Sequence, residues 1–120
     1  MEGDERSRAV LLGLLHALGS GVFRTKLVKL TYLLDEANYR FRGRSLTGFD
    51  YTWDHYGPNA EDNAIVRLLD ELITDGLVSM TTSPVPPNAV AHTYQATDRL
   101  DPSVLPLSGH DWAEIQTAVS

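Results

Sequence analysis

The stretch Asp50–Asn59, DYTWDHYGPN, constrains the fold of this chain more than any other part of the sequence. Its aromatic and polar residues alternate with the period of two that is typical of a half-buried strand. The alternating set is Phe49, Tyr51, Trp53 and His55 against Asp50, Thr52, Asp54 and Tyr56. Gly57 can adopt backbone angles that other residues avoid, and Pro58 has no N–H to donate. We therefore expect the strand to end at Gly57-Pro58 and a helix to begin at once, with Asn59 as its N-cap.

The alternation does not say which of its two faces is buried. Trp53 is therefore either a core side chain or an exposed side chain available for binding. The two cases predict different costs of truncation, because removing a large buried aromatic costs about 3–5 kcal/mol.

Two helices are predicted before this stretch. The first is nearly all apolar from Val10 to Leu18 and ends at Gly19-Ser20-Gly21, whereas residues 1–8 are charged and expected to be frayed. The second runs from about Thr25, its expected N-cap, to about Phe41, and Gly43 closes it. Its expected core face is Phe23, Leu27, Leu30, Leu34 and Ala37.

The rest of the chain predicts a helix, two strands and a short final helix. Gly76 is the expected left-handed residue after the third helix. Strands are expected at 77–82 and 90–97, joined by a loop at 83–89 whose three prolines should forbid regular pairing. Ser108 should cap the last helix, which has little room to bury itself before the chain ends.

These elements predict an α+β fold in a single domain, residues 1–120. A helical layer should lie beside a small three-stranded antiparallel sheet, because a helix followed by Gly-Leu and a hairpin is how winged-helix domains end. A strand lies between the second and third helices, whereas a standard helix-turn-helix joins them by a short turn. We therefore expect a winged-helix-like fold that is not an ordinary DNA reader.

The charge of the chain is unevenly distributed. The net charge is −6, yet six of the ten Lys and Arg residues lie between Arg24 and Arg44. Eleven acidic residues and two basic ones, Arg67 and Arg99, follow. Nucleic-acid binding usually needs a basic domain, so this distribution favours a protein partner that is recognised through complementary charge.

The second helix carries the expected partner surface. Lys26, Lys29 and Arg40 share one stripe with Leu33, and Arg42 and Arg44 lie near the C-terminal end, where positive charge suits the helix dipole. Aromatic anchors would come from Tyr32 and from the Tyr56-Gly57-Pro58 turn. The alternative interpretation is a merely solvated helix face, as most charged faces are.

The sequence does not point to an enzyme. It has no Cys, which excludes disulfides and thiolate metal ligands and fits the reducing cytoplasm. The four histidines are scattered without metal-ligand spacing, and no nucleophile elbow or phosphate-binding loop is present. No apolar run reaches the length of a membrane span, and we expect neither a cofactor nor a metal.

Several motifs together resemble the Panacea domain, the antitoxin domain of the SocA-like proteins. The motifs are Lys26-Leu-Val-Lys-Leu-Thr-Tyr-Leu33, Gly43, Leu46-Thr-Gly48, Tyr56-Gly57-Pro58, Leu69, Leu72, Gly76 and Leu77. The resemblance covers about residues 10–100. It implies an antitoxin that neutralises a cognate protein toxin by direct binding, and some relatives deliver the bound toxin to a ClpXP-type protease.

Two departures from the family stand out. The family's domain usually continues with further C-terminal helices, whereas this chain ends at Ser120, so that part is expected to be trimmed or lost. The proline-rich 83–89 loop also looks longer than the family's usual wing.

Two other functions compete with an antitoxin. A winged-helix transcription regulator would lay the basic second helix on the phosphate backbone, and a structural subunit of a larger complex would need neither toxin nor DNA. The acidic remainder of the chain disfavours the regulator. The identity of the partner and the oligomeric state are not encoded in any motif.

Overall fold

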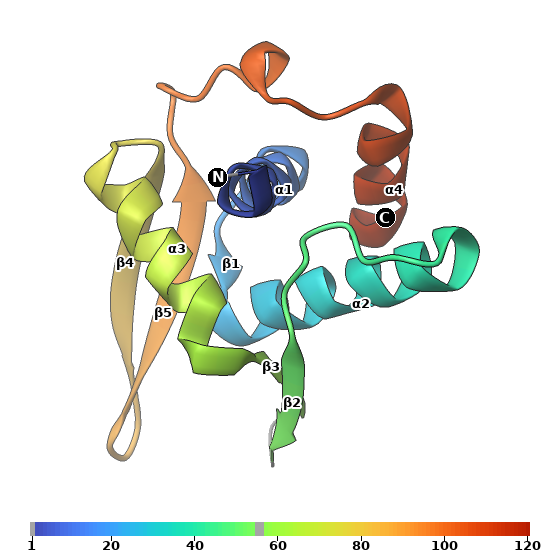
Figure 1. Cartoon of the computed structure of the whole chain (residues 1–120). Helices are drawn as coiled ribbons and strands as arrows, with labels where there is room; N and C mark the ends of the chain where they lie inside the picture. The colour runs from blue at the N-terminus through green and yellow to red at the C-terminus, as the bar shows by residue number, and fades with distance from the viewer. Residues whose placement is uncertain (1, 55–56) are drawn as a thin grey trace.

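Helix α1 (Glu2–Leu18) runs through the centre of the molecule, with the other elements arranged around it (Figure 1). This computed structural model describes residues 2–54 and 57–120. The side chains of Leu11, Leu14 and Leu15 are fully buried in the core. A helix that is apolar on most sides has to be enclosed in this way, because no single neighbour could cover all of it.

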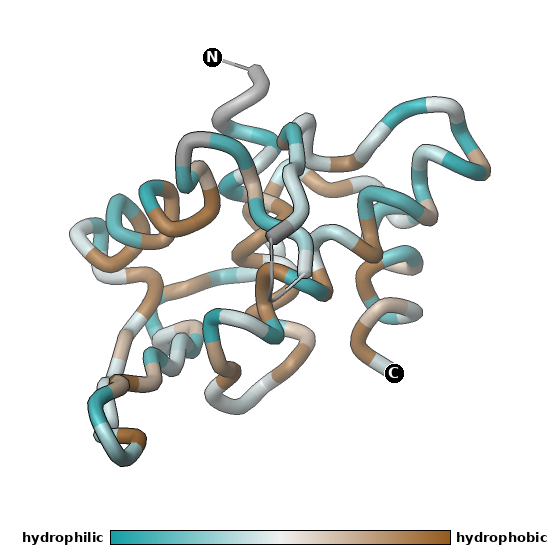
Figure 2. The backbone as a smooth tube through the Cα atoms, turned by 90° about the horizontal axis from the view of Figure 1, so that it is seen from below, coloured by the Kyte–Doolittle hydropathy of each residue, from teal (hydrophilic) through white to brown (hydrophobic). Residues whose placement is uncertain are grey.

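The fold is α+β, and the winged-helix-like arrangement predicted from the sequence is confirmed. The antiparallel sheet has the order β1-β5-β4, from strands β1 (Val22–Phe23), β5 (Ala89–Ala96) and β4 (Val78–Val85). Helices α2 (Arg24–Arg42) and α3 (Ala64–Thr74) follow α1 in the chain before the β4–β5 hairpin. Hydrophilic and hydrophobic residues both occur along the helices (Figure 2), and in α1 the charged residues come first and a nearly all-apolar stretch follows.

The strand predicted in the 49–56 stretch does not belong to that sheet. Strand β2 (Tyr51–Asp54) pairs with β3 (Gly57–Ala60) in a separate two-stranded hairpin, with Trp53 opposite Pro58. Strand β2 stops before Gly57-Pro58, but the expectation that a helix begins at once with Asn59 as its N-cap was wrong, because a second strand follows. Each strand of an isolated hairpin has one unpaired side, where a proline is tolerated.

Helix α3 begins later than the sequence suggested. A short 3₁₀ turn, Glu61–Asn63, separates it from β3, and the residue before α3 is Asn63, in the left-handed conformation and with no side-chain cap. Its C-terminal end is as predicted, with Gly76 at a φ of 80° and the N–H of Leu77 donating to the carbonyl of Leu72.

Helix α2 is also shifted from its prediction at the N-terminal end. It begins at Arg24, directly after β1, and the expected cap Thr25 lies inside it. Phe23, expected in the core, is 59% exposed, because pairing with β5 fixes the direction in which the chain enters the helix. At the other end Gly43 has a φ of 78° and its N–H donates to the carbonyl of Tyr39, which confirms the predicted stop.

The proline-rich loop is shorter than predicted. Pairing continues to Pro84 opposite Val90 and Val85 opposite Ala89, so the prolines do not prevent it. The strands there are exposed on both faces and form a projecting hairpin (Figure 1). Pro84 and Val90 form a non-hydrogen-bonded pair, in which the backbone N–H and C=O groups point away from the partner strand. The missing N–H of proline is therefore tolerated at this position.

Both ends of the chain are more firmly packed than expected. The N-terminal segment is helical from Glu2, and the side chains of Arg6 and Ser7 donate to the carbonyls of Leu46 and Thr47, each at 2.8 Å. Helix α4 (Gly109–Val119) packs on α1 and α2, with Ile115 fully buried.

Ser108 caps α4, as predicted, in a reciprocal capping box with Asp111. Among the described residues, none of the helices combines the length and apolar character needed to cross a membrane.

Candidate functional site

The inward face of α2 carries three buried polar residues, Thr31, Asp35 and Asn38. The predicted core face is confirmed at Leu27 and Leu34, whereas Leu30 and Ala37 are only partly buried, and these three polar residues were not predicted to be buried. Thr31 satisfies its hydroxyl within the helix by donating to the carbonyl of Leu27 at 2.8 Å. The amide nitrogen of Asn38 donates to the carbonyl of Arg44 at 2.7 Å, which closes the turn after the helix.

Asp35 is the main polar anchor of this region. Its carboxylate is 3% exposed and accepts hydrogen bonds from the backbone N–H groups of Leu46 and Thr47, each at 2.9 Å. The hydroxyls of Thr47 and Tyr51 also donate to it, the latter at 2.6 Å. A buried carboxylate is stable only with such partners, because burial removes its hydration.

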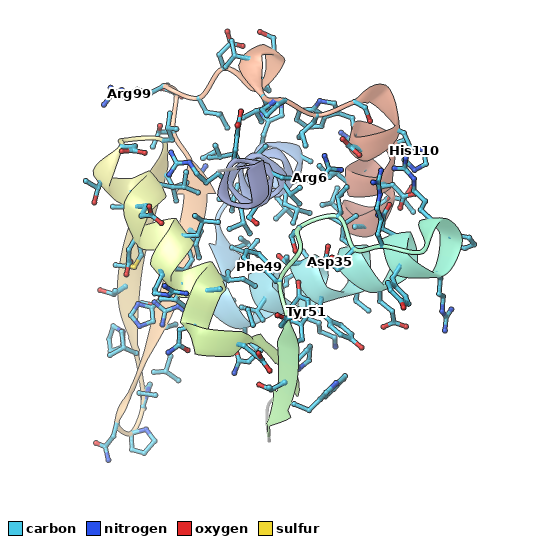
Figure 3. The ribbon with its side chains drawn as sticks, viewed as in Figure 1. Arg6, Asp35, Phe49, Tyr51, Arg99 and His110 are labelled. Atoms are coloured by element: carbon cyan, nitrogen blue, oxygen red, sulfur yellow. The ribbon has the colours of Figure 1, made fainter. Side chains whose placement is uncertain are left out.

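This anchor gives the Leu46-Thr47-Gly48 motif a structural role. Leu46 is buried, Thr47 binds the carboxylate of Asp35, and Gly48 has a φ of 84°, which favours glycine. The motif thus fastens the segment between α2 and β2 to the helix. The position of Asp35 on the buried face is visible in Figure 3, next to Tyr51.

Tyr51 attaches the β2–β3 hairpin to α2. Burial raises the pKa of its hydroxyl above the ordinary value, and the charge and hydrogen bond of Asp35 raise it further. The phenol therefore remains protonated and acts as a hydrogen-bond donor. An isolated two-stranded hairpin is marginally stable in water, so this contact matters for its position.

Aromatic rings extend from this attachment to the surface. Tyr32 of α2 packs edge-on against Tyr51 and Trp53, with ring centroids 5.2 and 5.5 Å apart, and Phe49 packs edge-on against Tyr51 at 6.5 Å. Trp53 is 67% exposed. Of the two cases that the alternation left open, the structure shows an exposed Trp53, although Tyr51 on the same face of the strand is directed at Asp35.

Cationic side chains lie on the outward face of the same helix. Lys26 and Lys29 are exposed and make no ion pair among the described residues. Leu33, also exposed, and Arg40 continue the stripe, with Arg40 3.7 Å from the carboxylate of Glu36. We call Lys26, Lys29, Tyr32, Leu33, Arg40, Trp53 and Pro58 the α2 surface.

Not every predicted partner residue joins the α2 surface. Arg42, the last residue of α2, points toward α4, with Nη1 3.9 Å from the Asp111 carboxylate. Arg44 is exposed beyond the end of the helix. Gly57, with a φ of 111°, starts β3, and Pro58 lies opposite Trp53. Tyr56 and His55 lie outside the described residues.

Trp53 and Leu33 are the members that sequence reasoning did not assign to the surface. The alternation of the 49–56 stretch already allowed an exposed Trp53. Which side of the strand faces the core depends on the contact with Asp35, which the alternation does not show. Leu33 lay on the recognised basic stripe and was not treated as an anchor.

The residues described in the structure show no metal centre. Among them no group of three or more His, Asp or Glu side chains is placed to hold an ion. His16 packs edge-on against Trp112, and Nε2 of His110 lies 3.2 Å from the carboxylate of Glu114. These contacts are local to α1 and α4.

No family model, curated protein or solved structure matches the chain.

Proposed function

We propose that this protein is a non-catalytic cytoplasmic antitoxin that binds and neutralises a cognate protein toxin through the α2 surface. The observation that carries the proposal is the position of Trp53 on β2. This large aromatic side chain is 67% exposed and packs against Tyr32 of the cation-bearing helix α2. Interfaces draw most of their free energy from a few aromatic and Arg residues. The resemblance of the Lys26–Leu33, Leu46–Gly48 and Tyr56–Pro58 motifs to the Panacea domain suggests the class of partner.

The charge distribution on the fold supports a protein partner over DNA. A winged-helix regulator would be expected to present α3 to the major groove and the β4–β5 hairpin to the backbone. The exposed residues of α3 include Asp70 and Glu71 and a single cation, Arg67, and the hairpin, residues 78–96, contains no Lys or Arg. Phosphate contacts require cations at these positions, since counterion release dominates DNA affinity.

The α2 surface combines two kinds of contact. Tyr32, Leu33 and Trp53 offer apolar area, and Lys26 and Lys29 offer positive charge to an acidic patch on the toxin. Charges at the rim of an interface chiefly set the rate of encounter, whereas the buried aromatic anchors set the rate of dissociation. The adaptor role, in which bound toxin passes to a ClpXP-type protease, would need a further contact elsewhere.

The experiment is a growth-rescue assay in which the chain is co-expressed with the product of the neighbouring open reading frame. Tyr32→Ala with Trp53→Ala should abolish rescue and raise the dissociation rate in purified binding measurements. Lys29→Glu should slow association instead. Phe41→Ala is the matched aromatic control, because Phe41 is exposed on α2 but outside the α2 surface. Arg99→Glu is the matched charge control.

The proposal fails if the Tyr32 and Trp53 double variant folds normally and still neutralises and binds at the wild-type rate. It also fails if the neighbouring gene product is not toxic and does not bind. Sequence-selective duplex binding with nanomolar affinity would favour the regulator instead.

A further inference from the structure

One edge of strand β5 is paired along its whole length, whereas only a short part of its other edge is paired. Strand β4 pairs with all eight of its residues, from Ala89 to Ala96. Strand β1 pairs with two of them, since Val22 is opposite Tyr94 and Phe23 opposite Thr93. The chain then turns into α2 at Arg24, so the edge from Ala89 to His92 has no neighbouring strand among the described residues.

The register identifies the backbone groups at this edge. The N–H of Thr97 donates to the carbonyl of Leu77 at 3.0 Å, and bonded pairs alternate along an antiparallel ladder. Alternate residues of β5, from Ala91 to Gln95, therefore exchange hydrogen bonds with β4. The N–H and C=O groups of Val90 and His92 point to the opposite side, in line with β1. The proline opposite Val90 fits this register, because Pro84 has no N–H to donate.

A groove lies beside this edge. It is lined by Phe23, Arg24, Thr25, Val85, Ala89, Val90, Ala91 and His92. Phe23 and Val90 are 59% and 56% exposed, so apolar surface lies beside the unpaired edge. Unpaired strand edges of this kind are templates for another strand, and this one carries no Lys, Pro or inward-pointing charge of its own to block pairing.

The groove is positively charged. No acidic residue lines it, and Arg24 forms part of its wall. The Arg24 guanidinium is held in place by two hydrogen bonds from Nε and Nη2 to the hydroxyl of Tyr94, the first at 2.9 Å, and it lies 5.6 Å from the centre of that ring. Its remaining nitrogen, Nη1, has no partner among the described residues. A fixed guanidinium of this kind suits a carboxylate.

We infer that the β5 edge accepts an extended, acidic segment of a protein partner as an additional strand. The segment would continue the line of β1, exchange hydrogen bonds with Val90 and His92, place apolar side chains against Phe23 and Val90, and present a carboxylate to Arg24. This is recognition by strand addition, in which the main chain supplies affinity and alternate side chains supply specificity.

A second copy of the chain is a poorer occupant than an acidic partner. Its long exposed edge strand, β4, has the sequence VSMTTSPV and brings no carboxylate to Arg24. The groove shares no residue with the α2 surface, and the inference does not depend on the proposed antitoxin activity.

Amide hydrogen exchange on the full chain gives the first test. The amides of Val90 and His92 should exchange faster than those of Ala91 and Thr93, which β4 protects. The probe is then an acetylated peptide of alternating valine and threonine that ends in two glutamates. It should slow exchange at Val90 and His92 and shift the resonances of Phe23, Arg24 and Val90. A peptide ending in two lysines should bind at least about tenfold more weakly.

Methylation of the peptide's own amide nitrogens separates strand addition from general apolar binding. Methylating the alternate nitrogens that face β5 should weaken binding by about tenfold or more, whereas methylating the other set should leave it unchanged. Equal effects of the two sets, equal binding of the acidic and basic peptides, or no protection at Val90 and His92 would each overturn the inference. A second copy of the chain would be the occupant, and the inference would also be overturned, if two results appeared together without peptide. These are protection of the Val90 and His92 amides that rises with protein concentration, and a doubled molecular mass of the protein in solution.

Discussion

The hydroxyl of Tyr51 donates a 2.6 Å hydrogen bond to Oδ2 of Asp35, and this contact joins the β2–β3 hairpin to the buried face of α2. Asp35 is 3% exposed and Trp53 is 67% exposed. Because Trp53 is two residues from Tyr51 on the same strand, the contact between Tyr51 and Asp35 also determines the position of Trp53. The proposed partner surface is therefore organised from the core.

The first prediction concerns the stability of this contact. Asp35→Ala should lower the free energy of unfolding by more than about 3 kcal/mol, because several buried donors lose their acceptor. Tyr51→Phe should cost about 1.5–3 kcal/mol, the range for a hydrogen bond to a charged group. The double variant should cost less than the sum. Additive losses in urea denaturation would show that the two residues act independently, and Asp98→Ala at an exposed position serves as the control.

The second prediction concerns alkaline pH. Burial and the Asp35 charge raise the pKa of Tyr51, so above the ordinary value of 10.0 the unfolded chain releases a proton that the folded chain retains. Stability should therefore be fully present below pH 10 and fall above it, by up to about 1.4 kcal/mol per pH unit for one group. Tyr51→Phe should flatten this dependence. The pKa of Tyr32 is also raised, by desolvation first and by Glu36 second, so some slope should remain.

The third prediction separates exposure from burial. Trp53→Ala should lower the free energy of unfolding by less than about 1.5 kcal/mol, since the loss is limited to ring packing against Tyr32. Leu69→Ala should cost about 2–5 kcal/mol, because Leu69 is fully buried in α3. Comparable midpoint shifts in the two denaturation curves would contradict the exposed position of Trp53.

The fourth prediction concerns the attachment of α4. The Asp111 carboxylate accepts from the backbone N–H of Ser108 at 2.9 Å and pairs with Arg6 at 3.3 Å, so it links the start of α4 to α1. Ser108→Ala should cost about 1 kcal/mol, the usual loss for an N-cap, and Asp111→Ala should cost more. Thermal melts would measure both, with Asp98→Ala at an exposed position as the control. A smaller loss for Asp111→Ala than for Ser108→Ala would contradict this link.

The fifth prediction concerns nucleic acid. A gel-shift titration at physiological salt should detect no duplex complex tighter than the nonspecific range of about 10⁻⁴–10⁻⁶ M. Weak binding at low salt should be lost in Lys26→Glu with Lys29→Glu, because these are the exposed cations of α2 without an ion pair among the described residues. A tight, sequence-selective complex would favour the regulator.

Local chemistry predicted much of the fold correctly. The stops at Gly43 and Gly76, the cap at Ser108 and the β4–β5 hairpin each depend on a few neighbouring residues, and the sequence contains those residues. The fold class followed from the order of these elements. The stripe of Lys26, Lys29 and Arg40 was also predictable, because helical spacing alone places them together.

Long-range contacts decided the rest. Whether Gly57-Pro58 ends a strand or begins one depends on pairing with β2. Which side of the 49–56 stretch faces the core depends on the hydrogen bond from Tyr51 to Asp35 of α2. The start of α2 depends on β5, some seventy positions later in the chain, through the pairing of Phe23 with Thr93. The sequence by itself therefore determined where most helices stop, the β4–β5 hairpin and the distribution of charge. The tertiary structure alone determined which side chains are exposed, because burial is a property of the neighbours that folding brings together.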